Sequence, residues 1–425
     1  MLTTPELCGE SAQCARLGEL LPRWLARVPL YQGADYTLDT SEAGAVSCEA
    51  FRRFPFINKR DMRRNFPANF LPEAAELEKL LDQGLVELER TSGTSESQVP
   101  LILPLGWWAE QEERALRLNP VVAAVLDEFP DARRCTITSP VCNGDICYSS
   151  TPARFDRIVG NSLHLSLNRQ PLMWTDTDLE RMAAEAVDWQ PQFLDVDPVY
   201  GVRFAQYCER RGIHLPSLRF ILCSYEFVSV AHRRILRRAF GVPVFDLYGA
   251  TETGHLLMEN DRGEMVPSCE TACLEVVETG ADGIGSLVVT TLTNDYMPLV
   301  RYRIGDLVER REHAGHATYL LHGREADAIA TPGGGRVTIR QLDQCFSGLE
   351  GFTHYQMVQT AEAEWQSRYM PDLTPPSPAD LAELRRRLSE RLGTAKGIEL
   401  RPTEFLLPEN SGKFRLSYPL PPASK

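Results

Sequence analysis

Short apolar runs alternate with helical stretches from about residue 135 onward, and this alternation restricts the fold more than any other feature of the sequence. The run RFILCSY (219–225) is followed by VAHRRILRRAF (230–240) and then by VPVFDLYG (242–249). Strands that alternate with helices along a chain pack as layers of helices on a sheet. Gly241 stands between the second and third runs, where a glycine commonly ends a helix. The pattern therefore predicts an α/β fold with layered sheets and helices.

Two further regions carry clear helix and strand patterns. The segment CARLGELLPRWLARVPLY (14–31) places apolar residues near helical spacing, and these are Leu17, Leu20, Leu21, Leu25 and Val28. The segments GADGIGSLVVTTL (280–292) and VRYRIGDLVERRE (300–312) are typical of two strands reached through glycine turns. The glycines of the first segment precede a strand and do not open a helix, so they do not form a dinucleotide-binding pattern.

A change of composition indicates a domain boundary near residue 325. The stretch GREADAIATPGGGRV (323–337) is rich in glycine and small residues. Beyond it, SPADLAELRRRLSERLG (377–393) has the signals of a complete helix, with Ser377 as N-cap, Pro378 in the first turn and Gly393 as terminator. We therefore expect a large N-terminal domain over residues 1–325 and a small, mobile C-terminal α/β domain over residues 326–425.

Charge and cysteine content narrow the class of protein. The net charge is −13, which argues against a nucleic-acid groove as the main surface. Eleven scattered cysteines fit a reducing cytosol better than a disulfide framework. The N-terminus has no basic region followed by an apolar one, and no apolar run approaches the roughly 18 residues that a membrane span requires. We expect a cytoplasmic protein with small soluble partners, and neither nucleic acid nor membrane among them.

Five short polar motifs follow one another along the chain, and their common order is more informative than any one of them. They are Ser92-Gly93-Thr94, Tyr248-Gly249-Ala250-Thr251-Glu252, Tyr302-Arg303-Ile304-Gly305-Asp306, Gly323-Arg324 with Asp327, and Asn410-Ser411-Gly412-Lys413. Each motif alone would most often be a turn or a solvated loop. Together they contain the residue types that a nucleotide site needs.

Three of these motifs are suited to phosphate and metal. A loop of hydroxyls and glycine such as 92–94 can donate several hydrogen bonds to phosphate oxygens. Glu252 could hold Mg²⁺, a hard cation that prefers oxygen ligands and often bridges to phosphates, and Thr251 could bind a phosphate or carboxylate oxygen. Lys413 could neutralise the charge where a carboxylate meets an α-phosphate.

The remaining motifs are suited to a nucleoside. Tyr248 offers a flat aromatic face for a purine. Asp306 could accept hydrogen bonds from a ribose diol, and Arg324 could reinforce that contact. Taken with the phosphate motifs, these residues predict that ATP serves as an AMP donor to a carboxylate.

On these motifs the sequence resembles the adenylate-forming (acyl-CoA synthetase) superfamily, and within it is most similar to the phenylacetate–CoA ligase branch. Further stretches carry the likeness, namely VPLYQG (28–33), FPFINKRDMRRNFP (54–67), DPVYGVRFAQYCERRGI (197–213), LRFILCSYEF (218–227) and LVVTTLTNDYMPLVRYRIGDL (287–307). The most specific of them is TTLTNDYMPLVRYRIGD, and the resemblance spans almost the whole chain.

The resemblance implies a role for each matching residue. The residues implied to bind ATP or AMP are Ser92, Gly93, Thr94, Ser95, Glu226, Asp246, Leu247, Tyr248, Gly249, Thr251, Asp306 and Arg324. The implied catalytic residues are Lys413, Thr251 and Glu252, with Glu252 also the magnesium ligand. The implied acyl pocket includes Tyr225, Ala250, Gly254 and His255, and the loop of Gly333, Gly334 and Gly335 is implied to lie near the incoming thiol. The small domain is implied to rotate after adenylate formation, before a thiol attacks.

Three positions depart from the family pattern. Where the family's phosphate loop continues with threonine, glycine and a basic residue, this chain has Ser95, Glu96 and Ser97. The family's hinge aspartate falls at Ala326, and Asp327 matches the next position. A proline is expected directly after Glu226, where this chain has Phe227.

The sequence therefore predicts an enzyme that uses ATP and Mg²⁺ to activate a small, aromatic or related carboxylic acid and transfers the acyl group to CoA. Two alternatives stay open. The acceptor could be the phosphopantetheine thiol of a carrier protein, or the chain could be a nucleotide- or acyl-binding protein that no longer turns over. The resemblance also allows a homodimer. Zinc bound by Cys269 and Cys273 with His255 is a weaker hypothesis, because the spacing matches no recognised zinc knuckle.

Overall fold

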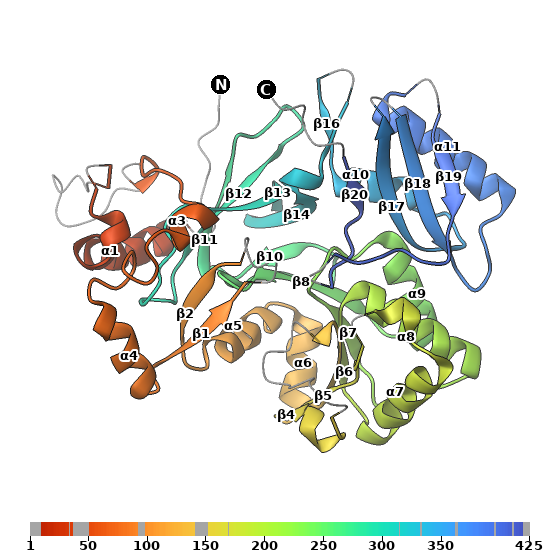
Figure 1. Ribbon diagram of the computed structural model, residues 1–425, viewed down its shortest axis with the longest axis horizontal. Helices are drawn as coiled ribbons and strands as arrows, with labels where there is room; N and C mark the ends of the chain where they lie inside the picture. Colours follow the sequence, from red (N-terminus) through yellow and green to blue (C-terminus); the bar gives the residue numbers. More distant parts are fainter. Residues whose placement is uncertain are drawn as a thin grey trace. The chain divides into compact units, whose positions relative to one another are not determined.

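The computed structural model describes residues 10–33, 35–36, 51–91, 98–140, 152–168, 170–313, 315–331, 334–361, 364–394, 397–409 and 412–419 (Figure 1). The chain divides into two compact units. The first consists of residues 1–120 and 247–321, and the second of residues 121–246 and 322–425. None of the helices in the described ranges is long and apolar enough to cross a membrane. The domain boundary expected between residues 325 and 326 stays a prediction.

Helices of the first unit come mainly from the N-terminal part of the chain. They are α1 (Glu10–Arg27), the 3-10 turn η1 (Pro29–Tyr31), α3 (Lys59–Arg63), α4 (Ala74–Asp82) and α5 (Trp107–Leu116). The predicted helix over 14–31 is confirmed as α1, which ends at Arg27 before Pro29. Its buried side chains recur at intervals of three and four residues, as Leu17, Leu20, Leu21 and Trp24, so one face packs into the core.

Strands of the first unit form one hairpin and a larger sheet. The hairpin pairs β1 (Val86–Arg90) with β2 (Pro100–Pro104) in antiparallel register. The larger sheet has the order β11-β12-β13-β14-β10-β9, and the last residues of β8 pair with β9. Its strands are β8 (Val244–Ala250), β9 (Gly254–Glu259), β10 (Met265–Pro267), β11 (Ala272–Val277), β12 (Ile284–Thr291), β13 (Tyr302–His313) and β14 (His316–Arg324). The two strands predicted over 280–312 are confirmed as β12 and β13, and Gly283 adopts a positive φ of 78° in the turn before β12.

A buried ion pair ties the N-terminal segment to this sheet. Arg301 donates from Nε and Nη2 to the two carboxylate oxygens of Glu275, at 3.1 and 3.0 Å. Its Nη1 donates to the carbonyl oxygens of Phe54, at 2.6 Å, and of Arg52. The guanidinium carbon lies 4.3 Å from the centre of the Phe56 ring. Every face of this cation therefore meets an acceptor or an aromatic ring, which offsets the cost of burying it.

The second unit contains a mainly parallel sheet covered by helices. The first residues of β8 pair with β7, and the order continues β7-β6-β3-β5-β4. The further strands are β3 (Arg134–Ile137), β4 (Ile158–Val159), β5 (Ser162–His164), β6 (Phe193–Val196) and β7 (Phe220–Cys223). All residues of β6 and β7 are buried, as is usual for parallel strands between helical layers. The predicted strand–helix–strand pattern over 219–249 is confirmed.

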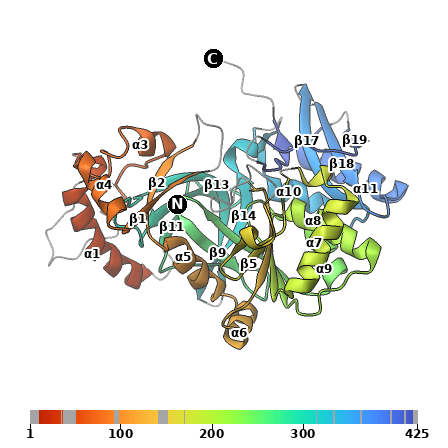
Figure 2. The ribbon, with the colours of Figure 1, turned by 60° about the horizontal axis from the view of Figure 1, so that its bottom comes forward.

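Helices of this part of the second unit lie side by side in both views (Figure 2). They are α7 (Asp176–Trp189), α8 (Pro198–Arg211) and α9 (Val230–Phe240), and α6 (Pro120–Glu128) and the 3-10 turns η3 (Phe155–Arg157) and η4 (Pro171–Met173) precede them. Asp197 caps α8 by accepting from the backbone of Val199, and Pro198 occupies the first turn. Gly241 ends α9 with a φ of 69°, as the sequence predicted.

The C-terminal part of the second unit has its own sheet, of order β19-β18-β17-β20. Its elements are η5 (Glu325–Asp327), β15 (Ile329–Ala330), β16 (Arg336–Val337), α10 (Ile339–Asp343), η6 (Gln344–Phe346), β17 (Phe352–Ala361), β18 (Glu364–Pro371), α11 (Pro378–Leu392), β19 (Glu399–Pro402) and β20 (Ser417–Tyr418). The predicted helix is confirmed as α11, with Ser377 as N-cap and Gly393 at its end with a φ of 64°. Leu384, Leu388 and Leu392 face the core.

Replacing Arg301 with methionine should destabilise the first unit, because it would leave the buried Glu275 carboxylate without its cation. We expect a loss of about 3–5 kcal/mol, measured as a lower urea midpoint. The double variant Arg301→Met/Glu275→Leu should recover part of that loss. Arg303→Met is the matched control, since Arg303 pairs with the exposed Glu278 and should cost about 1 kcal/mol or less. An equal loss in both single variants would contradict the assignment.

Candidate functional site

In the first unit, the YGATE motif (248–252) and the YRIGD motif (302–306) are joined crosswise by two hydrogen bonds. The Tyr248 hydroxyl donates to Asp306 Oδ2 at 2.7 Å, and the Tyr302 hydroxyl donates to Glu252 Oε1 at 2.7 Å. The paired residues are therefore 58 and 50 positions apart in the sequence. Four predicted or motif residues lie together as a result, with an aromatic face and two carboxylates among them.

Glu252 lies in the tight turn between β8 and β9 and is only 5% exposed. Besides Tyr302, it meets the ammonium of Lys59, whose Nζ lies 3.2 Å from Glu252 Oε1. Lys59 is the first residue of α3, and Asn58 caps that helix by accepting from the backbone of Arg60 at 2.8 Å. The carboxylate is thus held by one neutral donor and one cation, both from segments distant in sequence.

Close backbone approach shapes the hairpin that carries Glu252. A Cβ added to Gly249 would lie 2.3 Å from the carbonyl oxygen of Gly254, so only glycine fits there. Gly254 has a φ of 74°, and a Cβ on it would lie 3.0 Å from the Trp107 ring. The two positions therefore require glycine for a structural reason that is independent of any ligand.

The predicted acyl-pocket residues of the first unit lie against two tryptophans of α5. The His255 ring packs edge-on against Trp108, with ring centres 4.9 Å apart, and Gly254 lies over Trp107. Trp107 donates from Nε1 to the Thr293 hydroxyl at 3.0 Å, which fixes the orientation of its ring. The neighbourhood of Ala250, Gly254 and His255 is therefore bordered by aromatic side chains.

In the second unit, predicted residues gather where the parallel strands end. Tyr225 and Glu226 follow β7, and the Tyr225 hydroxyl donates to Asp195 Oδ2 at 2.9 Å. Glu226 Oε1 accepts a hydrogen bond of 2.5 Å from the backbone of Phe414, the residue after Lys413. Glu226 and the segment of Lys413, which lies 187 positions further along the chain, are thus brought together.

Two carboxyls at this edge have perturbed acidity. Burial raises the pKa of the Glu226 carboxyl well above its usual value, the nearby Asp197 raises it further, and Lys413 opposes the shift. Burial also raises the pKa of Asp197, against the backbone donors of Val199 and Tyr200 and the charge of Lys413. Burial thus disfavours the charged form of both carboxyls, and Lys413 favours it.

The other predicted residues of the second unit are more dispersed. Asp246 is buried on β8, with an oxygen 3.9 Å from Arg233. Arg324 is exposed at the end of β14, next to η5, where Asp327 binds Arg415 at 2.5 Å. Gly334 and Gly335 form an exposed turn between β15 and β16, since Thr331 and Gly335 are joined by a backbone hydrogen bond of 2.9 Å.

Some predicted residues lie outside the described part of the chain. They are Ser92, Gly93, Thr94 and Ser95, with Glu96, and Gly333 of the thiol loop. At the base of the first loop, Thr91 and Val99 pair, and the Thr91 hydroxyl accepts from the Val99 amide at 2.9 Å. The convergence of Thr94 and Arg324 with Glu252 and Asp306 stays a prediction, because Thr94 is not described and Arg324 belongs to the second unit.

Sequence reasoning missed several residues that contact the predicted ones. Lys59 lies within the stretch that carried the resemblance, and the capping pattern Asn58-x-x-Asp61 marks the start of its helix. Asp197 precedes Pro198, a pair that usually marks the start of a helix. This pattern predicts where Asp197 lies in the helix but not which side chains it meets. The tryptophans of α5 carried no signal, since their contact with the hairpin is a tertiary one.

No group of three or more His, Cys, Asp or Glu side chains that could hold a metal occurs among the described residues. Cys273 is buried in the core of the first unit, and Cys269 donates its thiol to the carbonyl of Pro267 at 3.6 Å. His255 packs on Trp108. The described geometry therefore provides no three-residue zinc site from these side chains.

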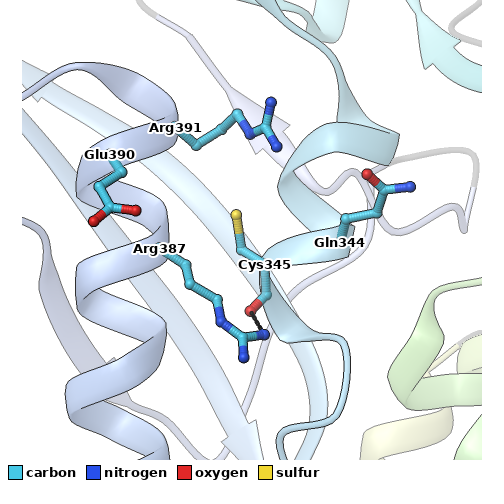
Figure 3. Close-up of a pocket in the computed structure, with 5 residues that line it drawn as sticks. All are labelled: Gln344, Cys345, Arg387, Glu390 and Arg391. Carbon is cyan, nitrogen blue, oxygen red and sulfur yellow. Dashed lines mark hydrogen bonds between the residues drawn. The ribbon is translucent and has the colours of Figure 1, made fainter.

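A separate hollow of about 320 Å³ lies between η6 and α11 of the second unit (Figure 3). It is lined by Gln344, Cys345, Arg387, Glu390 and Arg391. Arg387 donates to the carbonyl oxygens of Cys345 and Ser347, so its guanidinium closes the end of η6. None of the predicted site residues lines this hollow.

Comparison with known proteins identifies relatives over much of the chain. No protein-family model matches it. A phenylacetate–coenzyme A ligase of Pseudomonas putida is 24% identical over 323 residues, which cover 69% of this chain and 65% of that protein. A phenylacetate–coenzyme A ligase of Thermus thermophilus is 30% identical over 141 residues, or 30% of this chain and 32% of that protein. The matched part thus spans less than two thirds of each of these relatives.

Solved structures share the fold. The structure of 2-hydroxyisobutyryl-CoA ligase in its postadenylation state with 2-HIB-AMP matches 96% of this chain and 89% of its own, with a TM-score of 0.68 and 14% identity. The anthranilate CoA ligase AuaEII with anthranoyl-AMP matches 77% of this chain and 65% of its own, with a TM-score of 0.54. Together with the phenylacetate–coenzyme A ligase relatives, these matches confirm the resemblance inferred from the motifs. In sequence and fold, the chain is thus similar to adenylate-forming CoA ligases, phenylacetate–coenzyme A ligases among them.

Proposed function

We propose that this chain activates a small carboxylic acid with ATP as an acyl-adenylate and then transfers the acyl group to the thiol of CoA. The observation that carries the proposal is the crosswise pairing of Tyr248 with Asp306 and of Glu252 with Tyr302. In this arrangement the Tyr248 ring would stack on the base, and the Asp306 carboxylate would bind the ribose diol. The Glu252 carboxylate would bind the cation that accompanies the phosphates. The relatives named above as CoA ligases support the same assignment.

In the first step, a carboxylate oxygen of the acid attacks the α-phosphorus of ATP. The new bond joins that oxygen to phosphorus, and the bond from the α-phosphorus to the bridging oxygen breaks, so pyrophosphate leaves. Lys413 would offset the negative charge that gathers between the two reactants, which repel each other. Tyr248 and Asp306 would orient the nucleoside, so much of the rate gain would come from positioning.

In the second step, the thiolate attacks the acyl carbonyl of the adenylate. The carbon–sulfur bond forms, the bond from carbon to the phosphate oxygen breaks, and AMP leaves. Gly334 and Gly335 form an exposed turn, and we assign the glycines 333–335 to the approach of the thiol on the family resemblance. Rotation of the C-terminal domain about the region of Ala326 and Asp327 stays part of the proposal.

Magnesium fits the donor set at Glu252. Mg²⁺ in nucleotide sites is usually bound by one or two carboxylates together with substrate phosphates and water. Glu252 supplies one carboxylate, whose Oε1 is already held by Tyr302 and Lys59. A bound magnesium ion would neutralise phosphate charge, while Lys59 and Tyr302 would keep the Glu252 carboxylate in place.

The tryptophans beside the hairpin support an aromatic or other compact apolar acid. Trp107 and Trp108 border Gly254 and His255, which the family resemblance assigns to the acyl pocket. Aromatic rings pack well against aromatic substrates through edge and offset contacts. A location in the cytoplasm and a homodimer remain expectations from the sequence.

Exchange of labelled pyrophosphate into ATP tests the first step. We expect exchange with at least one acid from a panel of phenylacetate, substituted benzoates and short aliphatic acids, with the aromatic acids preferred. Omission of Mg²⁺ should abolish the exchange. Measurable ATP binding without exchange for any acid would instead favour a binding protein that no longer turns over.

Truncation of the lysine tests its role. Lys413→Ala should lower the rate of adenylate formation by about 10²–10³-fold, the usual loss when one charge-stabilising donor is removed. The fold should stay intact, as judged by circular dichroism, because the side chain of Lys413 is only partly buried. Lys79→Ala on the exposed surface of α4 is the control. Exchange at the wild-type rate in Lys413→Ala would remove this residue from the mechanism.

The thiol acceptor distinguishes CoA from a carrier protein. We expect CoA to trap the acyl group as a thioester at saturating acid and ATP, measured by mass spectrometry of the product. A phosphopantetheinylated carrier protein should react more slowly at equal concentration. Acyl transfer to the carrier alone, with none to CoA, would replace the proposed acceptor and leave the first step intact.

A further inference from the structure

The two neighbours of Lys413 in the sequence, Gly412 and Phe414, each contact residues between positions 139 and 226 of the same unit. Gly412 has a φ of 87°, and a Cβ on it would lie 2.5 Å from the Ser139 hydroxyl oxygen. The Tyr200 hydroxyl lies 3.5 Å from the Gly412 carbonyl oxygen, to which it donates. The residue before the lysine therefore fits only as glycine, in a conformation that glycine adopts without strain.

Phe414, on the other side of the lysine, is held by its backbone and by its ring. Its amide donates to Glu226 Oε1 at 2.5 Å, a short distance typical of a charge-assisted bond. Its ring packs edge-on against Tyr200 and His354, with ring centres 6.2 and 5.5 Å apart. The ring is 5% exposed and belongs to the core of the second unit, so the direction of the chain at Lys413 is set from both neighbours.

The turn that presents Glu226 is itself anchored. Asp195, 4% exposed, accepts from the Ser224 hydroxyl at 2.8 Å and from the Tyr225 hydroxyl at 2.9 Å. Tyr225 has a φ of 75°, a conformation that a bulky residue rarely adopts and that the two bonds to Asp195 stabilise. Backbone strain of this kind is common at functional sites. Here the strained conformation of Tyr225 sets the direction in which the next residue, Glu226, leaves the turn.

Groups of opposite charge lie near one another where the Lys413 segment meets Glu226. The side chain of Lys413 interacts electrostatically with both Asp197 and Glu226. The further titratable groups that interact with Glu226 are Glu409 and Tyr418. A neutral glutamine could accept from the Phe414 amide equally well, so the use of a buried carboxyl there requires another reason, because burying a carboxyl costs free energy. Lys413 supplies the compensating charge.

We propose that Glu226 is a positioning residue for Lys413, which it places through the Phe414 amide, and that Asp197 with Glu226 supplies the counter-charge that keeps the ammonium in that place. The assignment rests on the proposed role of Lys413 in adenylate formation. It gives the Glu226 side chain a function beyond the backbone contact with adenine that the family resemblance implied.

Three variants separate backbone placement from charge. Glu226→Ala removes the acceptor for the Phe414 amide and one of the two carboxyls. Glu226→Gln keeps the acceptor and removes one carboxyl, and Asp197→Asn/Glu226→Gln keeps the acceptor and removes both carboxyls. Glu404→Gln, an exposed carboxylate of the same segment without a role at Lys413, is the matched control. Melting temperature is measured for each variant, so that loss of fold is recognised.

Two readouts are used on the full chain. The first is kcat and KM for ATP in pyrophosphate exchange. The second is the acylation of Lys413 by an amine-reactive reagent relative to the exposed Lys79, measured by mass spectrometry. The chain has only five lysines, at 59, 79, 396, 413 and 425, so the labelled peptides are few. The labelling readout requires no turnover.

We expect Glu226→Ala to lower kcat by roughly 10- to 100-fold, the range that misplacement of a reacting group produces. KM for ATP should be nearly unchanged, and labelling of Lys413 should rise several-fold because its side chain is no longer held. Glu226→Gln should restore most of kcat, whereas the double variant should lose it again and label rapidly.

The proposal would be overturned if Glu226→Ala lowered the melting temperature but left kcat and the labelling of Lys413 as in the wild type. Equal behaviour of Glu226→Gln and the double variant would overturn the counter-charge part. If the wild type shows no exchange with any acid, the proposed function fails while the labelling still decides the contact. Faster labelling of Lys413 in Glu226→Ala then supports the placement, and unchanged labelling refutes it.

Discussion

The buried pair of Arg301 and Glu275 is the constraint on which the geometry of the first unit depends. Arg301 has a positive φ of 51° and satisfies its guanidinium with Glu275 and with backbone carbonyls of the N-terminal segment. Its neighbour Tyr302 is thereby directed toward Glu252, and the following strand carries Asp306 toward Tyr248. The N-terminal segment reaches the same place, because Ile57 pairs with Tyr302 and Lys59 then meets Glu252.

Local signals in the sequence were sufficient for elements whose ends are set by their own residues. Helix α11 begins and ends where Ser377 and Gly393 predicted, and α9 ends at Gly241. The order of the motifs predicted one shared nucleotide site, and the structure adds the contacts of Tyr248 with Asp306 and of Glu226 with the backbone beside Lys413.

Contacts that arise from packing could not be predicted in this way. Lys59 meets Glu252 because the N-terminal segment is tied to the residues around Arg301, through the carbonyls of residues 52 and 54 and through Ile57, across more than two hundred positions. Asp197 has the sequence signature of an ordinary helix cap, and its effect on Glu226 is the repulsion between two carboxyls that the fold brings close. Trp108 has no pattern that links it to His255. Such neighbours depend on tertiary structure, which pattern reasoning does not supply.

The replacement of the expected proline by Phe227 also has a physical account. Phe227 packs against the apolar cluster of the C-terminal segment, together with Val230 at the start of α9. The backbone of Val230 donates to Asp343 at 3.0 Å, so the same stretch contributes both apolar and polar contacts to that segment. A rigid pyrrolidine ring would offer much less apolar area here than a benzyl side chain.

The position of Gly412 restricts which residues the C-terminal segment can carry beside Lys413. A single methyl group at this position would collide with the side chain of Ser139. The C-terminal segment therefore packs against Ser139 because residue 412 has no side chain. Because the positive φ of Gly412 would remain strained for any other residue, a smaller side chain at 139 could relieve the collision but not the requirement for glycine.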